Sequence, residues 1–420
     1  MKRRVVITGW GLVTPLSCDV DDCWSRILKG ESGIHAIKLF ETQDIKVRFG
    51  GDVYDWDATD AIGQKEANKV DRYSQFAMVA ADAALKFANF RTAFDQAGHP
   101  LDRGHRFGVV LGSGIGGMTT FSEQMERLVL KGPSRVSPMT IPKLMLNAGG
   151  GNIAIKHGFR GPNYGVATAC ASATNAMGNA LDLIRDNICD MVVTGGSEAA
   201  MSRLGLSAFA NMKALSSFEG DPVKASRPFD ASRDGFVFAE GAGVLLFEEL
   251  EHARARGATI LAEVVGFGTT CDAGHITSPD EDGTGAAAAM QAALVSAQLV
   301  PEDIDYINAH GTSTPLGDKA ETRAIKTIFG QHAYRVSISS TKSQLGHSLG
   351  ASGGIELVFS IKAILEGIVP PTINLENPDP DCDLDFTPNV PKQRDIQFAM
   401  SNSFGFGGHN ASIIVKRFTA

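Results

Sequence analysis

The sequence contains no uninterrupted run of about 18 apolar residues, the length that a transmembrane helix needs. Strand-forming residues begin at Val5, so we expect no cleaved targeting segment before the first strand. Six cysteines scattered over 420 residues form no disulfide framework, and they predict a reducing, cytoplasmic setting. These scarcities argue against a membrane-spanning or disulfide-stapled protein.

The sequence also lacks a net positive charge and the spacings of metal ligands. The formal net charge is −8, which argues against nucleic acid as a partner. Cys18 and Cys23 lie near His35 in the sequence, and Cys271 lies near His275. Neither group has the spacing of a metal site, so we expect no metal ion.

Glycine is abundant instead, with 46 residues, and a hydrophobic content of 43% is enough for a large core. Alternating strand and helix patterns predict a mostly parallel sheet covered by helices. A faint internal repeat places a strand with a glycine turn at Val5–Gly11 and again at Ile260–Gly268. The charged stretch Glu248–Gly257 predicts a solvated helix. We place the boundary between two halves after it, giving 1–257 and 258–420.

Cys170 is the most informative residue, and it lies in the small-residue run Val166–Thr174. Strand-forming residues precede it and an amphipathic helical pattern follows, so we expect the thiol at the start of a helix. The unpaired N–H groups of a first helical turn carry partial positive charge and favour the thiolate. A buried structural cysteine explains this segment alone equally well.

Two histidines favour the catalytic interpretation. His310 follows the predicted strand Ile304–Asn308 and enters a turn rich in glycine and threonine. His347 follows a second short strand and precedes the apolar helical run Ile355–Ile364. One thiol and two imidazoles, with Lys342 to orient or polarise them, indicate nucleophilic catalysis with stabilisation of developing charge.

These segments and four further motifs resemble the β-ketoacyl-[acyl-carrier-protein] synthase family over residues 3–416. The further motifs are Arg4–Gly11, Val193–Ala199, Ser226–Asp230 and Asn402–Gly408. The resemblance implies a thiolase-like α/β fold whose two duplicated halves form an α-β-α-β-α layered sandwich, with the site between them. It also implies a decarboxylative Claisen condensation in fatty-acid elongation. Malonyl-[acyl-carrier protein] would react with an acyl chain on Cys170 to give 3-oxoacyl-[acyl-carrier protein] and carbon dioxide.

The resemblance also implies roles for single residues. His310 and His347 would donate hydrogen bonds to the enolate oxygen. The main-chain N–H groups of Cys170 and Phe406 would hold the oxyanion of acyl transfer, and Phe406 would act as a gate. Glu356 resembles the buried acid of the family, a reading compatible with an ion pair to Lys342. Further substrate-binding positions are Thr312 and Thr314 for the phosphopantetheine arm, and Ile115, Gly205 and Phe209 for the acyl chain.

The resemblance extends to subtype and partners. Ile115, in place of a glycine, resembles the synthase II type, which handles medium and long chains. An acidic carrier protein would need a local basic patch on this acidic chain. The docking positions of the family correspond to Lys65, Lys69, Arg135 and Lys213. The family also implies a homodimer, and no cofactor beyond the phosphopantetheine arm that carries the substrates.

Three alternatives share parts of this pattern. A polyketide-type ketosynthase uses the same residues with other acyl chains, although we expect no fused carrier or transferase segment in this protein. A degradative thiolase would need a second catalytic cysteine late in the chain, where Cys382 lies in an acidic, proline-rich loop. A noncatalytic partner such as a chain-length factor would lack the nucleophile, whereas Cys170, His310 and His347 are all present.

Overall fold

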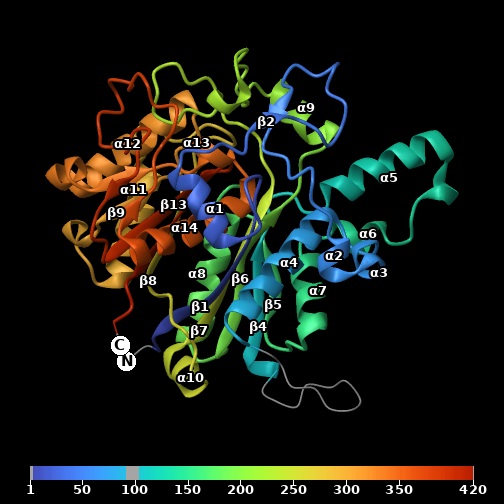
Figure 1. Ribbon diagram of the computed structural model, residues 1–420, viewed down its shortest axis with the longest axis horizontal. Helices are drawn as coiled ribbons and strands as arrows, with labels where there is room; N and C mark the ends of the chain where they lie inside the picture. Colours follow the sequence, from blue (N-terminus) through green and yellow to red (C-terminus); the bar gives the residue numbers. More distant parts are fainter. Residues whose placement is uncertain (1–2, 91–103, 420) are drawn as a thin grey trace.

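A large sheet forms the frame of the molecule in the computed structural model, which describes residues 3–90 and 104–419 (Figure 1). Its strands are β1 (Val5–Val13), β4 (Phe107–Gly112), β5 (Asn163–Val166), β6 (Met191–Glu198), β7 (Gly241–Glu249), β8 (Ala262–Cys271), β9 (Tyr306–Asn308), β10 (Ser337–Ser339), β13 (Phe398–Gly405) and β14 (His409–Lys416). They lie in the order β10-β9-β13-β14-β8-β1-β7-β6-β4-β5. Two short pairs stand apart: β2 (His35–Ala36) with β3 (Phe49–Gly50), and β11 (Ile368–Val369) with β12 (Lys392–Gln393).

Helices complete a five-layered sandwich. They are α1 (Val20–Leu28), α2 (Thr59–Ile62), α3 (Gln64–Ala67), α4 (Arg72–Phe87), α5 (Met118–Lys131), α6 (Thr140–Leu144), α7 (Ala148–His157), α8 (Ser172–Arg185), α9 (Arg203–Asn211), α10 (Leu250–Ala255), α11 (Thr284–Ala297), α12 (Pro315–Phe329), α13 (Lys342–Leu345) and α14 (Ser352–Glu366). The middle layer is α8 and α14, which contact strands of both halves of the sheet. Helices α4 and α7 cover one outer face, and α11, with α12 packed on it, covers the other. None of the described helices is long and apolar enough to span a membrane.

The two halves of the sheet repeat one pattern of pairing. Reading inward, β5-β4-β6-β7-β1 and β10-β9-β13-β14-β8 each contain two parallel pairs and then two antiparallel pairs, and β1 joins β8 antiparallel. The predicted duplication is therefore present. The prediction of a mostly parallel sheet was wrong, because the inner strands reverse direction. Strands β13 and β14, for example, are joined by a tight turn that only an antiparallel pair can use.

The sequence predicted a glycine turn at the end of each strand of the repeated motif. The glycines instead lie inside the strands. A β-carbon on Gly9 or Gly11 of β1 would come within 2.2 or 2.0 Å of a main-chain oxygen of α4. On Gly266 or Gly268 of β8 it would come within 2.4 or 2.2 Å of one in α11. Glycine is needed at these four positions because the covering helix approaches the strand backbone too closely for a side chain.

The predicted solvated helix at 248–257 was partly wrong. Glu248 and Glu249 end β7, and the helix begins only at Leu250. The Glu248 side chain is fully buried and binds Arg256 and His252, each at 2.6 Å. This acid is tolerated inside the strand because the Arg256 charge and the hydrogen bonds compensate its burial.

Candidate active site

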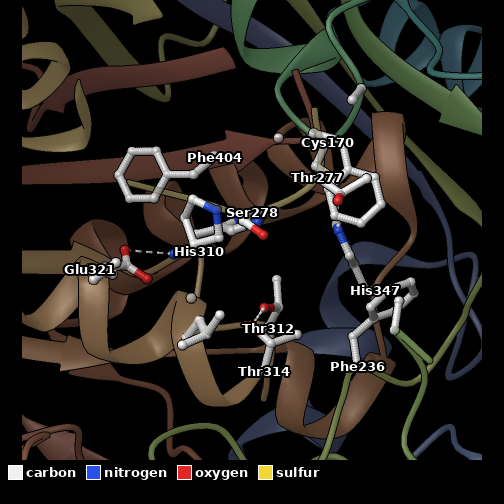
Figure 2. Close-up of a pocket in the computed structure, with 18 of the residues that line it drawn as sticks. Cys170, Phe236, Thr277, Ser278, His310, Thr312, Thr314, Glu321, His347 and Phe404 are labelled. Carbon is white, nitrogen blue, oxygen red and sulfur yellow. Dashed lines mark hydrogen bonds between the residues drawn. The ribbon is translucent and has the colours of Figure 1, made fainter. Parts of the chain in front are cut away.

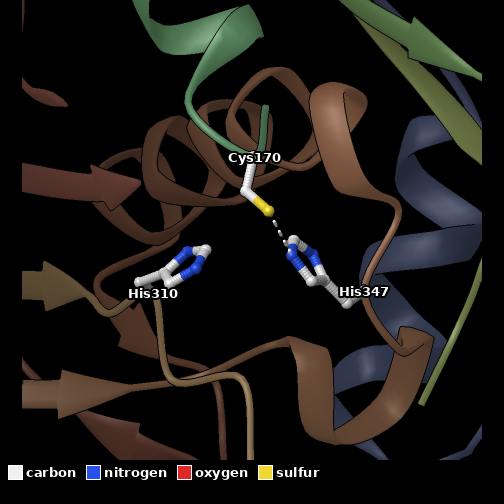
Figure 3. Close-up of side chains that lie close together, drawn as sticks. All are labelled: Cys170, His310 and His347. Atoms are coloured by element: carbon white, nitrogen blue, oxygen red, sulfur yellow. Dashed lines mark hydrogen bonds between the residues drawn. The ribbon is translucent and has the colours of Figure 1, made fainter. Parts of the chain in front are cut away.

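Cys170 lies in the turn between β5 and α8, immediately before the cap residue Ala171. The strand, turn and helix confirm the predicted local structure. Ala169 adopts a left-handed conformation with φ of 48°, which turns the chain sharply ahead of the thiol. The Cys170 Sγ lies 3.0 Å from Nε2 of His347 (Figure 3).

The thiol is not thiolate-like in the resting structure. Burial raises the pKa of Cys170 to about 12, against the lowering effects of the Lys342 charge and of the main-chain N–H groups of Phe406 and Cys170. The sequence-based expectation of a favoured thiolate was therefore wrong for the resting state. Loss of solvent destabilises the thiolate more than the helix terminus and the Lys342 charge stabilise it.

His310 is held by the turn that follows β9. The main-chain N–H of His310 donates to Glu321 Oε1 at 2.9 Å, and that of Gly311 donates to Oε2 at 2.8 Å. Burial raises the pKa of Glu321 to about 7, although these N–H groups lower it. Glu321 therefore fixes the backbone that carries the first imidazole.

His347 reaches the thiol from the opposite side, after α13. Its main-chain N–H donates to Val237 O at 2.7 Å, and its main-chain oxygen accepts from Ala239 at 3.0 Å. The ring meets Phe236 edge to face, with centroids 5.4 Å apart. The rings of His310 and His347 lie 5.3 Å apart and nearly perpendicular. Two imidazoles thus face one thiol, as Figure 3 shows.

Both imidazoles are neutral at physiological pH. Burial lowers the pKa of His310 and of His347 well below its usual value, and the nearby Lys342 charge lowers both further. A neutral imidazole carries a single N–H and can donate through only one of its two nitrogens. The tautomer of each ring therefore decides whether the nitrogen that faces the cavity donates or accepts a hydrogen bond.

Lys342 and Glu356 form a buried ion pair. The Lys342 ammonium makes no hydrogen bond to either imidazole among the contacts of the described chain. It acts on Cys170, His310 and His347 through its charge. Glu356 is thus the ion-pair partner of Lys342.

A cavity of about 540 Å³ opens over the thiol and the two imidazoles (Figure 2). Its lining contains most of the predicted site residues: Cys170, His310, His347, Ile115, Phe209, Thr312, Thr314, Phe406 and Lys213. Thr312 and Thr314 lie beside His310, and their hydroxyl oxygens are 3.0 Å apart. The cavity thus brings the residues predicted to bind the acyl chain and the arm around one thiol.

Some predicted site residues lie elsewhere. Gly205 is buried in α9, where its N–H donates to Ser202 Oγ, and it does not line the cavity. Lys342 and Glu356 do not line it either, and both are buried in their ion pair. Lys65, Lys69 and Arg135 are exposed and lie outside the lining.

The loop that carries Phe406 closes one wall of the cavity. A β-carbon on Gly405 would come within 2.8 Å of the Cys170 nitrogen. Gly407 and Gly408 both have positive φ, at 84° and 73°. Glycine therefore allows the close approach and the left-handed turn that bring the Phe406 N–H toward the sulfur.

Three functional acids and hydroxyls were missed as such from the sequence. Glu321 holds the His310 turn, and Glu198 accepts N–H groups from Gly114 at 2.6 Å and Gly350 at 3.1 Å. Ser352 hydrogen-bonds His347 at 3.0 Å. Glu198 stands inside the motif Val193–Ala199, and Glu321 and Ser352 follow His310 and His347 in the sequence. The sequence does not show that these side chains are buried or which groups they bind.

Cys170, His310 and His347 are also the one group of three potential metal ligands within residues 3–90 and 104–419, with donor atoms within 4.8 Å of one another. The sequence pairs around His35 and His275 are not part of such a group.

Comparison with known proteins agrees with this geometry. The family model described as "Beta-ketoacyl synthase, N-terminal domain" matches residues 2–253, and that for the C-terminal domain matches 261–376. A 3-oxoacyl-[acyl-carrier-protein] synthase 2 of Synechocystis sp. is 48% identical over 99% of both chains. Its namesake from Staphylococcus aureus is 46% identical over 100% of this chain and 99% of its own.

Solved structures show the same likeness over 100% of both chains. A beta-ketoacyl synthase from Burkholderia phymatum superimposes with a TM-score of 0.90 at 34% identity. A type II PKS ketosynthase, solved in complex with its acyl-carrier protein and bound to the hexaketide, gives the same two values. Fold and site together define a thiolase-like condensing acyltransferase. The chain belongs to the beta-ketoacyl synthase family, as its motifs predicted.

Proposed function

We propose that the chain is a 3-oxoacyl-[acyl-carrier-protein] synthase of type II, which extends acyl chains in fatty-acid synthesis. The observation that carries the proposal is the contact of 3.0 Å between Cys170 Sγ and His347 Nε2, with His310 beside them on the same cavity. The identity of 45–48% to curated synthases of that type supports the choice of substrate.

Acyl transfer comes first. The Cys170 sulfur attacks the thioester carbon of an acyl-carrier protein, and the carrier thiol leaves with the proton of the cysteine. The negative oxygen of the tetrahedral intermediate needs N–H donors at the same place. The main-chain groups of Cys170 and Phe406 suit this task because both act on the sulfur. The acyl-cysteine then waits in a cavity closed by the Phe406 loop.

Condensation follows on malonyl-carrier protein. Its carboxylate leaves as carbon dioxide, and the electron pair moves through the α-carbon onto the thioester oxygen. His310 and His347 are neutral and each offers an N–H to that enolate oxygen. The α-carbon then attacks the acyl-cysteine, the 3-oxoacyl product forms, and the Cys170 thiolate leaves and regains a proton from solvent.

A turnover assay with malonyl-carrier protein and a series of acyl-carrier proteins tests the reaction. One two-carbon extension with one carbon dioxide released is the expected result. Repeated extension to a poly-β-keto chain would identify a polyketide ketosynthase, the class of one structural neighbour at 34% identity. Absence of carbon dioxide release would identify a noncatalytic partner.

We propose four exposed basic residues as the docking positions of the acidic carrier protein: Lys65, Lys69, Arg135 and Lys213. Lys213 lies at the cavity itself, where a pantetheine arm would enter. Lys69 is 2.7 Å from Glu66, so part of its charge is already paired.

Reversal of these four residues to Glu is expected to raise KM for carrier-protein substrates about tenfold, because exposed charges mainly steer encounter and fix register. Free pantetheine thioesters should be little affected. Added salt should weaken the wild type in the same direction, since exposed charges are screened over about 10 Å at 0.1 M ionic strength. Kinetics with both substrate forms at two salt concentrations measure the effect.

A matched control reverses four exposed basic residues that lie away from the cavity: Lys29, Lys86, Arg335 and Lys392. It has the same residue types and the same change in net charge. Equal loss with carrier-bound and free substrates, or equal loss in the control, would remove the docking assignment.

We propose that a second copy of the chain covers the free edge of the sheet at β5. Residues 163–165 of this edge strand are exposed, and exposed apolar side chains occur on the neighbouring helices α5, α6 and α7. Val129 of α5 is 75% exposed and Ile155 of α7 is 82% exposed, which is costly for a monomer. In Figure 1, α5 projects away from the body of the sheet.

Sedimentation equilibrium tests the proposed dimer. It should give twice the chain mass, and a monomer at micromolar concentration would contradict the proposal.

We also propose the division into 1–257 and 258–420, a cytoplasmic location, and a reaction that needs no cofactor beyond the phosphopantetheine arm. The mirrored strand orders on either side of the β1–β8 pairing support the division. Undiminished turnover of dialysed, chelator-treated enzyme would support the absence of a further cofactor, and loss of turnover that a metal restores would contradict it.

A further inference from the structure

The second nitrogen of His347 has a side-chain partner. Its Nδ1 lies 3.0 Å from the hydroxyl oxygen of Ser352, the first residue of α14. Both residues are buried, at 2% and 3% exposure. The opposite nitrogen, Nε2, is the one that points at Cys170 (Figure 3). A chain of two hydrogen bonds therefore runs from Ser352 through the imidazole to the nucleophile.

Two proton arrangements fit these distances. In the first, the Ser352 hydroxyl donates to Nδ1, and the single ring proton sits on Nε2, facing the sulfur. In the second, Nδ1 carries the proton and donates to Ser352, and Nε2 presents a lone pair to the Cys170 thiol. Only the first gives His347 an N–H to donate into the cavity.

The surroundings of Ser352 decide between the two arrangements. In the second arrangement the hydroxyl proton of Ser352 would need another acceptor, and within the described chain its side chain has no hydrogen bond except that to His347. Leaving that buried proton unpaired is costly. In the first arrangement the hydroxyl proton of Ser352 is satisfied by its hydrogen bond to Nδ1 of His347. The N-terminus of α14 and the Lys342 charge also oppose a second proton on the ring, so the imidazole stays neutral.

We propose that Ser352 is a positioning residue that donates to Nδ1 of His347 and thereby fixes the ring proton on Nε2, where the enolate oxygen forms. This inference rests on the proposed role of His347 as a hydrogen-bond donor. His310 has no equivalent anchor: its Nδ1 is buried without a hydrogen-bond partner among the described residues. The two imidazoles are therefore held differently, and loss of Ser352 disables one donor of the two.

Kinetics of three variants of the full chain provide the first readout. Ser352→Ala should lower kcat for carbon dioxide release and condensation by about 10- to 100-fold, with KM little changed, the size of loss seen when the hydrogen-bond partner of a metal-ligating histidine is removed. Ser352→Thr keeps the hydroxyl and should restore most of the activity. Ser360→Ala is the matched control. It removes another buried hydroxyl of α14, which only binds the Glu356 main-chain oxygen at 2.9 Å, and it should leave kcat unchanged.

The protonation of the ring is the second readout and decides the matter if the Thr methyl does not fit. Histidine-selective ¹⁵N spectra, with His347 assigned from a His347→Asn variant, should show the proton on Nε2 in the wild type. Ser352→Ala should show a shift toward the Nδ1–H form. A wild-type proton on Nδ1, or an Ala variant with unchanged kcat and spectrum, would overturn the proposal. Failure of the wild type to release carbon dioxide would instead contradict the proposed function, because the spectrum reads the tautomer independently of turnover.

Discussion

Cys170→Gln is expected to abolish condensation and to keep or raise the release of carbon dioxide from malonyl-carrier protein. The Gln amide resembles an acyl thioester in shape and polarity but cannot accept an acyl group. The two imidazoles that face position 170 remain, so decarboxylation retains its donors. Cys170→Ala should lose acyl transfer by roughly 10³-fold or more, because no other side chain of the cavity can hold the covalent intermediate.

Separate assays of carbon dioxide and of 3-oxoacyl product measure the two half-reactions. Cys382→Ala is a suitable control, since it removes a buried thiol whose pKa burial likewise raises, to about 11. A parallel fall of both half-reactions in Cys170→Gln would contradict their separation.

Alkylation by iodoacetamide checks the nucleophile directly, but it must be run in a Cys271→Ser background because Cys271 is exposed. The rate at Cys170 should rise steadily as pH increases through neutrality. Burial raises the pKa of this thiol to about 12, so the thiolate is a small fraction that increases with pH. A rate independent of pH would mean that the thiolate already dominates in the resting enzyme.

Ile115→Phe is expected to reduce activity on long acyl chains by up to roughly 100-fold and to spare short ones, because overpacking costs about 1–3 kcal/mol. Ile115 lines the cavity with Phe209 and packs in the same apolar cluster. Its loop is held firmly, since the Ile115 N–H donates to Glu198 at 3.2 Å. A larger side chain there cannot simply move away, and it takes space from the distal part of the acyl chain.

Rates with acyl-carrier proteins of increasing length, measured for wild type and variant, give the test. Ile188→Phe makes the same substitution at a residue that is 48% exposed and outside the cavity, and it should change nothing. An equal loss at every chain length would place Ile115 away from the acyl chain.

The sequence predicted the local structure around Cys170 and His310 correctly, because the signals for it are local. Cys170 lies between a strand and a helix, and His310 follows a short strand, as predicted. The resemblance also gave the layered fold. The prediction that Gly205 lines the acyl-chain cavity was wrong, because a motif position does not say which side of a helix faces the cavity.

Electrostatic states were the weakest prediction. The position of Cys170 at a helix start suggested a thiolate, yet burial outweighs the helix terminus and raises the pKa of the thiol. Glu248 looked solvated in a charged run, yet it is buried in β7 against Arg256. In both cases the missing information was how much water the rest of the fold removes.

By itself the sequence determined the family and the repetition of two halves, and it predicted the reacting groups and the local structure around them. The tertiary structure alone decided the arrangement. Cys170 and His347 are 177 residues apart, and their contact exists only because α8 and α14 share the middle layer of the sandwich. The proton position on His347 likewise depends on the direction of one serine hydroxyl. Local patterns specify conformation over a few residues, whereas distances, burial and tautomers are set by what the whole chain packs around them.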